Sequence, residues 1–162
     1  MRRERPSCAR GRAKPAPVPE ARLPDRKPPA SPESLAPETL LGSLAFTFRA
    51  DEAANYLADV RESLELYSEH GLAHPGFLLR AANAILVANV ELGPWIHTGS
   101  AVRHLGLVAD GDRISVRGRV RDEYERKGHR FVELDVLLVE RSRGPVLSVL
   151  HTAIYRPRPA RT

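Results

Sequence analysis

Cysteine is almost absent from this sequence, whose 162 residues include only Cys8. A disulfide within the chain, a cysteine-ligated zinc ion and a cysteine nucleophile in the folded part are therefore excluded. Such sparse use of cysteine is typical of a reducing compartment, and we expect a cytoplasmic protein. The sequence also lacks an uninterrupted run of about 20 apolar residues and an apolar segment after its N-terminal arginines, which argues against a membrane span and a secretory signal.

The motifs of several common enzyme classes are missing as well. The sequence has neither a glycine-rich phosphate loop nor a Gly-x-Ser-x-Gly nucleophile motif. His97 and His104 lie an odd number of residues apart in one expected strand, so their side chains face opposite sides of a sheet and do not share a metal ion. We expect His151, on a strand in the middle of the sheet, to be a hydrogen-bonded core histidine. No metal and no cofactor is predicted.

Proline and positive charge are concentrated at the start of the chain. The first 39 residues hold nine of the 14 prolines, nine Lys or Arg and five Asp or Glu, so they carry four of the five net positive charges. Because such a segment buries too little apolar surface to offset its chain entropy, we predict a disordered or polyproline-like tail over residues 1–39 and one domain over residues 40–162. A transit peptide and an electrostatic tether are the alternatives to a merely solvating tail. Since the domain itself is nearly neutral, nucleic-acid binding is not expected, and deletion of the tail should leave the melting temperature nearly unchanged.

The rest of the sequence contains one long helical region and several strand-like ones. Residues 45–49 alternate apolar and polar side chains as a strand does, and Asp51 is placed to cap a short helix over residues 52–59. Residues 77–90 are apolar nearly all round, which is typical of a buried helix, with Pro75 at its first position and His74 at its cap. Four strands are then predicted, over residues 96–106, 112–124, 129–140 and 145–156. This order predicts an α+β hot-dog fold, a bent antiparallel sheet of about five strands wrapped around one long central helix.

Charge patterns predict how two of these strands pair. Pairing that places Arg117 opposite Asp135 and Arg119 opposite Glu133 keeps the apolar residues of both strands on one face, and it implies a three-residue turn closed by Gly128. The arginines then form either a solvent face neutralised by ion pairs or a face that binds phosphate. A five-stranded sheet of this kind leaves an open edge, so we expect a dimer joined edge to edge.

The start of the buried helix is the candidate site. A helix N-terminus offers backbone N–H groups and a positive dipole end that can polarise a carbonyl oxygen, and Gly76 lets a ligand approach that backbone closely. His74 lies beside this end, where the dipole favours a neutral imidazole that can act as a base. Glu69, five residues earlier, is placed to orient His74 or to share with it the activation of a water molecule.

Residues 40–157 resemble the MaoC-like family of hot-dog acyl dehydratases and R-specific enoyl-CoA hydratases. The motif of that family is an Asp followed by four residues and a His, and Glu69 and His74 have this spacing. Residues 93–97 and 108–112 are similar to the next strand of the family and its turn. The chain departs from the pattern in having Glu for Asp and in lacking the Asn-Pro pair that precedes the family's histidine.

The resemblance implies a function and a set of site residues. Glu69 and His74 would activate water for addition across a 2-enoyl thioester of CoA or a carrier protein, or remove the hydroxyl group in reverse. The Gly76 N–H would hold the thioester oxygen, with Pro75 and Phe77 beside it as further substrate-binding residues. An acyl-CoA thioesterase that uses Glu69 alone is one alternative. A catalytically degenerate subunit that binds acyl chains, or that completes a heterodimer with an active hot-dog chain instead of forming a homodimer, is the other.

Overall fold

The computed structural model describes residues 15–159. Its elements in chain order are β1 (Leu40–Thr47), α1 (Ala50–Asp59), α2 (Glu65–Ser68), α3 (Pro75–Asn89), β2 (Ile96–His104), β3 (Arg113–Arg126), β4 (His129–Glu140) and β5 (Gly144–Arg156). The long helix and the four later strands are present with small differences at their ends, whereas the first strand begins five residues earlier and ends two residues earlier than predicted. No helix among the described residues is long and apolar enough to cross a membrane.

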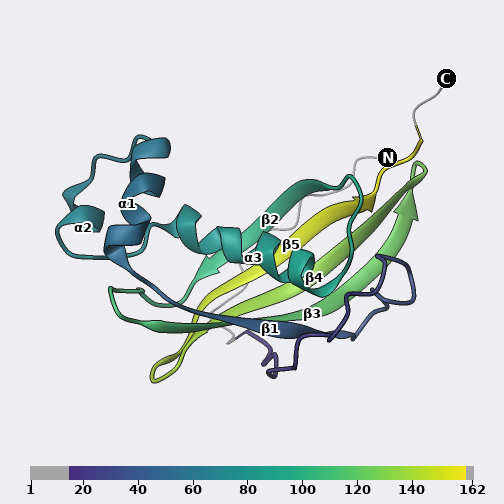
Figure 1. The fold of residues 1–162 in the computed structure, drawn as a ribbon, viewed down its shortest axis with the longest axis horizontal. Helices are drawn as coiled ribbons and strands as arrows, with labels where there is room; N and C mark the ends of the chain where they lie inside the picture. The colour runs from purple at the N-terminus through teal and green to yellow at the C-terminus, as the bar shows by residue number, and fades with distance from the viewer. Residues whose placement is uncertain (1–14, 160–162) are drawn as a thin grey trace, which may run out of the picture.

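The five strands form one antiparallel sheet in the order β1-β3-β4-β5-β2. Figure 1 shows this sheet curving around α3, while α1 and α2 lie beyond the end of the sheet at which α3 begins. A bent antiparallel sheet wrapped around one helix is the hot-dog fold, so the predicted α+β class is confirmed. The two edges of the sheet are β1 and β2.

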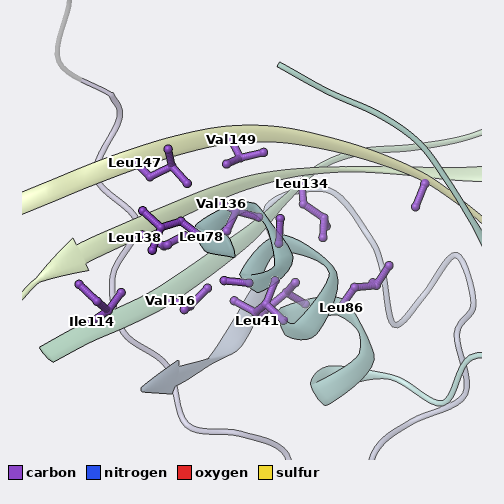
Figure 2. Close-up of a cluster of buried hydrophobic side chains, with 14 of the residues drawn as sticks. Leu41, Leu78, Leu86, Ile114, Val116, Leu134, Val136, Leu138, Leu147 and Val149 are labelled. Atoms are coloured by element: carbon purple, nitrogen blue, oxygen red, sulfur yellow. The ribbon is translucent and has the colours of Figure 1, made fainter. Parts of the chain in front are cut away.

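The apolar face of α3 packs on the concave side of the sheet. Ile85 and Leu86 are fully buried, and Figure 2 shows Leu78 and Leu86 of the helix in one cluster with apolar side chains of the strands, such as Leu138. Burying each side chain of this size contributes about 1.5–3 kcal/mol relative to leaving it exposed. Gly118 of β3 permits the close approach of the helix, because a Cβ at that position would lie 2.8 Å from the Ile85 Cδ1.

Asn89, at the end of α3, ties the helix to a bulge in β1. Its Oδ1 accepts a hydrogen bond from the Gly42 N–H at 2.6 Å, and its Nδ2 donates to the carbonyl oxygens of Gly42 at 2.9 Å and Ile85 at 2.8 Å. The bulge lies between Leu41 and Leu44. One buried amide therefore satisfies backbone groups that the sheet leaves unpaired at the bulge.

β3 and β4 pair in antiparallel fashion as predicted, but the predicted register is wrong by two residues. Arg119 lies opposite Asp135, and Arg117 lies opposite Leu137. Because side chains alternate between the faces of a sheet, a shift of two residues leaves every side chain on its own face. The apolar pattern therefore determines the faces of the two strands and not their register.

The turn between these strands explains the difference. Lys127 and Gly128 have φ values of 54° and 76°, which is the geometry of a two-residue hairpin turn and not of the expected three-residue one. A bulge between Val120 and Asp122 then inserts an extra residue into β3 and sets the pairing beyond it.

The start of α1 differs from the prediction in the residue that caps it. Arg49 is the N-cap and makes no side-chain capping bond. Asp110, distant in sequence, instead accepts a hydrogen bond from the Ala50 N–H at 2.9 Å. Asp51 lies in the first turn, where its charge is favourable to the helix dipole without capping the helix.

Residues 15–39 lie against the domain, contrary to the predicted disorder of the tail. The side chains of Val18 and Leu35 are 3% and 0% exposed. The Ser43 N–H donates to the Ala21 carbonyl at 2.8 Å, which attaches the segment to β1. The prediction of disorder considered only the apolar residues of the segment itself, which are too few to form a core of their own. In the structure these apolar residues pack on a core that the rest of the chain supplies. Residues 1–14 lie outside the described residues, and the domain boundary at residue 39 stays a prediction.

Candidate functional site

His74 is the N-cap residue of α3, as predicted. Its Nδ1 accepts a hydrogen bond from the Gly76 N–H at 3.0 Å, which assigns the neutral tautomer with a proton on Nε2. That Nε2 lies 3.5 Å from the Oε2 of Glu62. The side chains of His74 and Glu62 are 22% and 21% exposed, so the pair is largely shielded from water and still reachable by a ligand.

The N–H groups at the start of α3 already have acceptors. Pro75 has no N–H, the Gly76 N–H donates to His74 Nδ1, and the Phe77 N–H donates to the His74 carbonyl at 3.0 Å. The Tyr56 hydroxyl also lies over Gly76, so closely that a Cβ there would clash with it. The expectation that the Gly76 N–H is open to a thioester oxygen is therefore not met in this conformation.

The predicted pair of Glu69 and His74 is not in contact. Glu69 is the C-cap residue of α2, with an exposed side chain that makes no hydrogen bond or ion pair with a described residue. The carboxylate that approaches His74 belongs to Glu62, in the connection between α1 and α2. Sequence reasoning missed Glu62 because it lies twelve residues before His74, at no spacing that a motif marks.

Aromatic rings from the two small helices enclose His74. The Tyr67 ring of α2 meets the imidazole edge-on at a centroid distance of 4.9 Å, and the Tyr56 ring of α1 lies 5.6 Å away. Tyr56 in turn packs edge-on against Phe77, and the Arg80 guanidinium lies within 5.8 Å of both rings. The two helices at the end of the sheet thus supply one wall of the candidate site.

The predicted substrate-binding residues line two different hollows. Phe77 lies in a groove of about 780 Å³ between α3 and β1, whose other lining residues include Ala84 and Phe46. Pro75 and Tyr67 line a separate cavity of about 150 Å³. The larger groove is mostly apolar along α3, and its volume lies in the range of known ligand pockets.

A second polar cluster joins β2 and β5. The Ser100 Oγ lies 3.0 Å from the His97 Nε2 and 3.4 Å from the His151 Nδ1, and the two imidazole rings stack at 4.6 Å. Burial, together with the nearby His97, lowers the pKa of His151 to about 4. The prediction of a hydrogen-bonded core histidine holds for Nδ1 alone, because the buried Nε2 has no partner among the described residues. Within residues 15–159, no three His, Cys, Asp or Glu side chains cluster as a metal site requires.

Solved structures resemble this chain, although no protein-family model and no curated protein matches its sequence. A protein from Archaeoglobus fulgius described as a monoamine oxidase regulatory protein has a TM-score of 0.68 and 16% identity, over 82% of this chain and 98% of that one. The (R)-hydratase from A. caviae involved in PHA biosynthesis has a TM-score of 0.64 and 16% identity, over 78% and 99%. The MaoC-like dehydratase from Rhodospirillum rubrum has a TM-score of 0.60 and 16% identity, over 79% and 97%.

Identities of this size show the fold alone. The chain has the hot-dog fold of MaoC-like dehydratases and R-hydratases, as its sequence resemblance implied. A fluoroacetyl-CoA-specific thioesterase and a chain of the ChsH1–ChsH2 complex from Mycobacterium tuberculosis have the same fold. The choice among reactions must therefore come from the site and not from the architecture.

Proposed function

We propose that this protein hydrates a 2-enoyl thioester of CoA or a carrier protein, and dehydrates the 3-hydroxyacyl thioester in reverse. The observation that carries the proposal is the approach of His74 to Glu62 at the start of α3. Phe77, three residues after His74 on the same helix, lines an apolar groove. An imidazole with a defined proton, a carboxylate and room for an acyl chain are the parts that addition of water requires. The fold shared with R-hydratases and MaoC-like dehydratases supports this substrate class.

In this proposal the carboxylate and the imidazole share one water molecule. The His74 Nε2–H holds the water, and the carboxylate accepts one of its protons as the oxygen adds to C3 of the enoyl group. The carboxylic acid then delivers that proton to C2, so the product differs from the substrate by one water. In reverse, the carboxylate removes the C2 proton and returns it to the leaving hydroxyl group. Glu62 is the nearest carboxylate, and Glu69 is the one that the motif spacing indicates.

The loss of enoyl absorbance on incubation with 2-enoyl-CoA substrates of increasing chain length tests the proposal. His74→Ala should abolish turnover while the circular dichroism spectrum stays unchanged. Of Glu62→Gln and Glu69→Gln, the variant that removes the base should lower kcat about 100-fold or more. Glu65→Gln, which changes an exposed carboxylate on α2, is the matched control and should retain full activity. Absence of turnover by the wild-type protein at every chain length would exclude hydration of CoA substrates.

A subunit without activity is a second candidate. It is favoured by one observation, the hydrogen bond that occupies the Gly76 N–H and leaves a thioester oxygen no donor there. Copurification of another hot-dog chain, together with absence of activity in the hydration assay, would support this candidate.

A thioesterase is favoured by a different observation, the exposed carboxylate of Glu69, which has no partner among residues 15–159. It would release free thiol from an acyl-CoA. That activity should be lost in Glu69→Gln and retained in His74→Ala, the reverse of the pattern expected for a His74-dependent hydratase.

We also propose that the protein is a dimer in the cytoplasm. The edge strand β2 is largely exposed, with Ile96 at 50%, and pairing of two such edges would cover both. Either a homodimer or a heterodimer with a second hot-dog chain satisfies this geometry. The molar mass measured by light scattering distinguishes both from a monomer.

A further inference from the structure

A hollow on the convex face of the sheet has no role in the proposed reaction. It has a volume of about 680 Å³ and lies beside the edge strand β1. Its lining includes Arg113, Ser115 and Arg117 of β3 and Arg141, which follows β4. The residues between them on β3 point into the core, so these polar side chains face away from α3. We propose that this hollow is a binding site for a phosphate group.

Glu20 of the N-terminal segment already shows how the hollow holds an anion. Its Oε1 accepts hydrogen bonds from the Ser115 Oγ and from the Arg117 Nη2, both at 2.9 Å. The Arg117 Nε also donates to the Ser115 Oγ at 3.3 Å, which orients the hydroxyl group toward the carboxylate. A hydroxyl group and a guanidinium fork are the donors that recognise phosphate oxygens in proteins.

The hollow holds more positive charge than Glu20 neutralises. Arg113 and Arg141 line it, and neither side chain has a hydrogen bond or ion pair with a described residue. Arg121, farther along β3, is in contrast paired with Asp135 at 3.6 Å. Three guanidinium groups therefore share one carboxylate, and a dianionic phosphate monoester would balance their charge more closely than Glu20 does.

Glu20 and the phosphate would compete for the same donors. The Glu20 side chain is 61% exposed, whereas that of Arg117 is 25% exposed, so the carboxylate can leave while the arginine stays in place. The phosphate could be free or could belong to a nucleotide, such as the 3′-phosphate of a CoA thioester. The assignment to CoA rests on the proposed function, whereas the phosphate site itself does not.

Isothermal titration of the full-length protein at low salt tests the site, with inorganic phosphate and adenosine 3′,5′-bisphosphate as the two probes. Arg113→Gln and Arg141→Gln should each weaken binding about tenfold or more, because each removes a charged hydrogen-bond donor. Glu20→Gln should tighten binding, because it removes the competing carboxylate. Arg121→Gln is the matched control, since it removes one positive charge from the same strand outside the hollow.

The two probes separate the sources of the phosphate. Equal affinity indicates a site for the phosphate group alone, and tighter binding of the bisphosphate indicates a nucleotide. Wild-type affinity in both Arg113→Gln and Arg141→Gln would overturn the proposal, as would equal weakening by Arg121→Gln, because binding would then follow net charge. Enoyl hydration is measured separately, so its failure is distinguishable from failure of the phosphate site.

Discussion

Replacing Leu35 with Ala tests whether the N-terminal segment belongs to the folded domain. The Leu35 side chain is 0% exposed and is part of the core cluster that includes Leu41 and Val120. A buried leucine-to-alanine change costs about 2–5 kcal/mol, since a cavity adds to the lost transfer free energy. We expect about 3 kcal/mol, because a segment without regular structure can relax into part of the cavity. For a domain of this size that loss lowers Tm by about 6–12 °C.

Differential scanning calorimetry measures the effect, and Leu23→Ala is the control. Leu23 belongs to the same segment but is 38% exposed. Its replacement should therefore lower the free energy of unfolding by at most about 1 kcal/mol. A Leu35→Ala variant as stable as Leu23→Ala would refute the packing of the segment on the core. An unchanged Tm after deletion of residues 1–39, the outcome expected from composition, would refute it as well.

The remaining predictions concern the core and its response to acid. Asn89→Ala should cost about 2–4 kcal/mol in urea denaturation, because it leaves the buried backbone N–H and carbonyl groups of Gly42 without partners. Gly118→Ala should lower the free energy of unfolding by about 1–3 kcal/mol, because its Cβ would clash with α3. Gly99→Ala is the control, because a Cβ at that position meets nothing within 4 Å and causes no such clash. The pKa of His151 is lowered to about 4 in the folded protein, from 6.5 for a histidine in an unfolded chain. Between these two pH values the unfolded chain therefore binds more protons than the folded protein. The free energy of unfolding should consequently fall as the pH falls from 6.5 to 4. Thermal unfolding of His151→Leu should show a weaker dependence over that range, and an unchanged dependence would contradict the assignment.

Local patterns were sufficient to predict the helix and its cap. Pro75 can begin a helix because it has no N–H to leave unpaired, and the apolar stretch after it needs burial on most sides. Both features act within a few residues of the chain, so α3 and its His74 cap were predictable from sequence. The boundaries of β2 to β5 were predictable for the same reason, since alternation and turn residues are also local, whereas the start of β1 was not.

Contacts between distant parts of the chain were not predictable in the same way. Asp110 caps α1 from another loop, and Glu62 meets His74 only because the connection between α1 and α2 folds back toward α3. The spacing of Glu69 from His74 is typical of a family motif, but spacing alone does not place a carboxylate next to an imidazole. A single sequence gives no pattern for such pairs, because each depends on the path of the intervening chain.

The corrected register also affects how the N-terminal segment is attached. In the predicted register, Asp135 was the partner of Arg117, and Glu133 was the partner of Arg119. In the observed register, Asp135 lies opposite Arg119 and also pairs with Arg121, which leaves Arg117 with an apolar residue opposite it. Glu20 supplies a carboxylate to Arg117 and Glu38 supplies one to Arg119, so two ion pairs join β3 to the segment that composition predicted to be disordered. Because Glu20 reaches only one of the arginines that line the hollow, the attached segment leaves the excess positive charge on which the phosphate site depends.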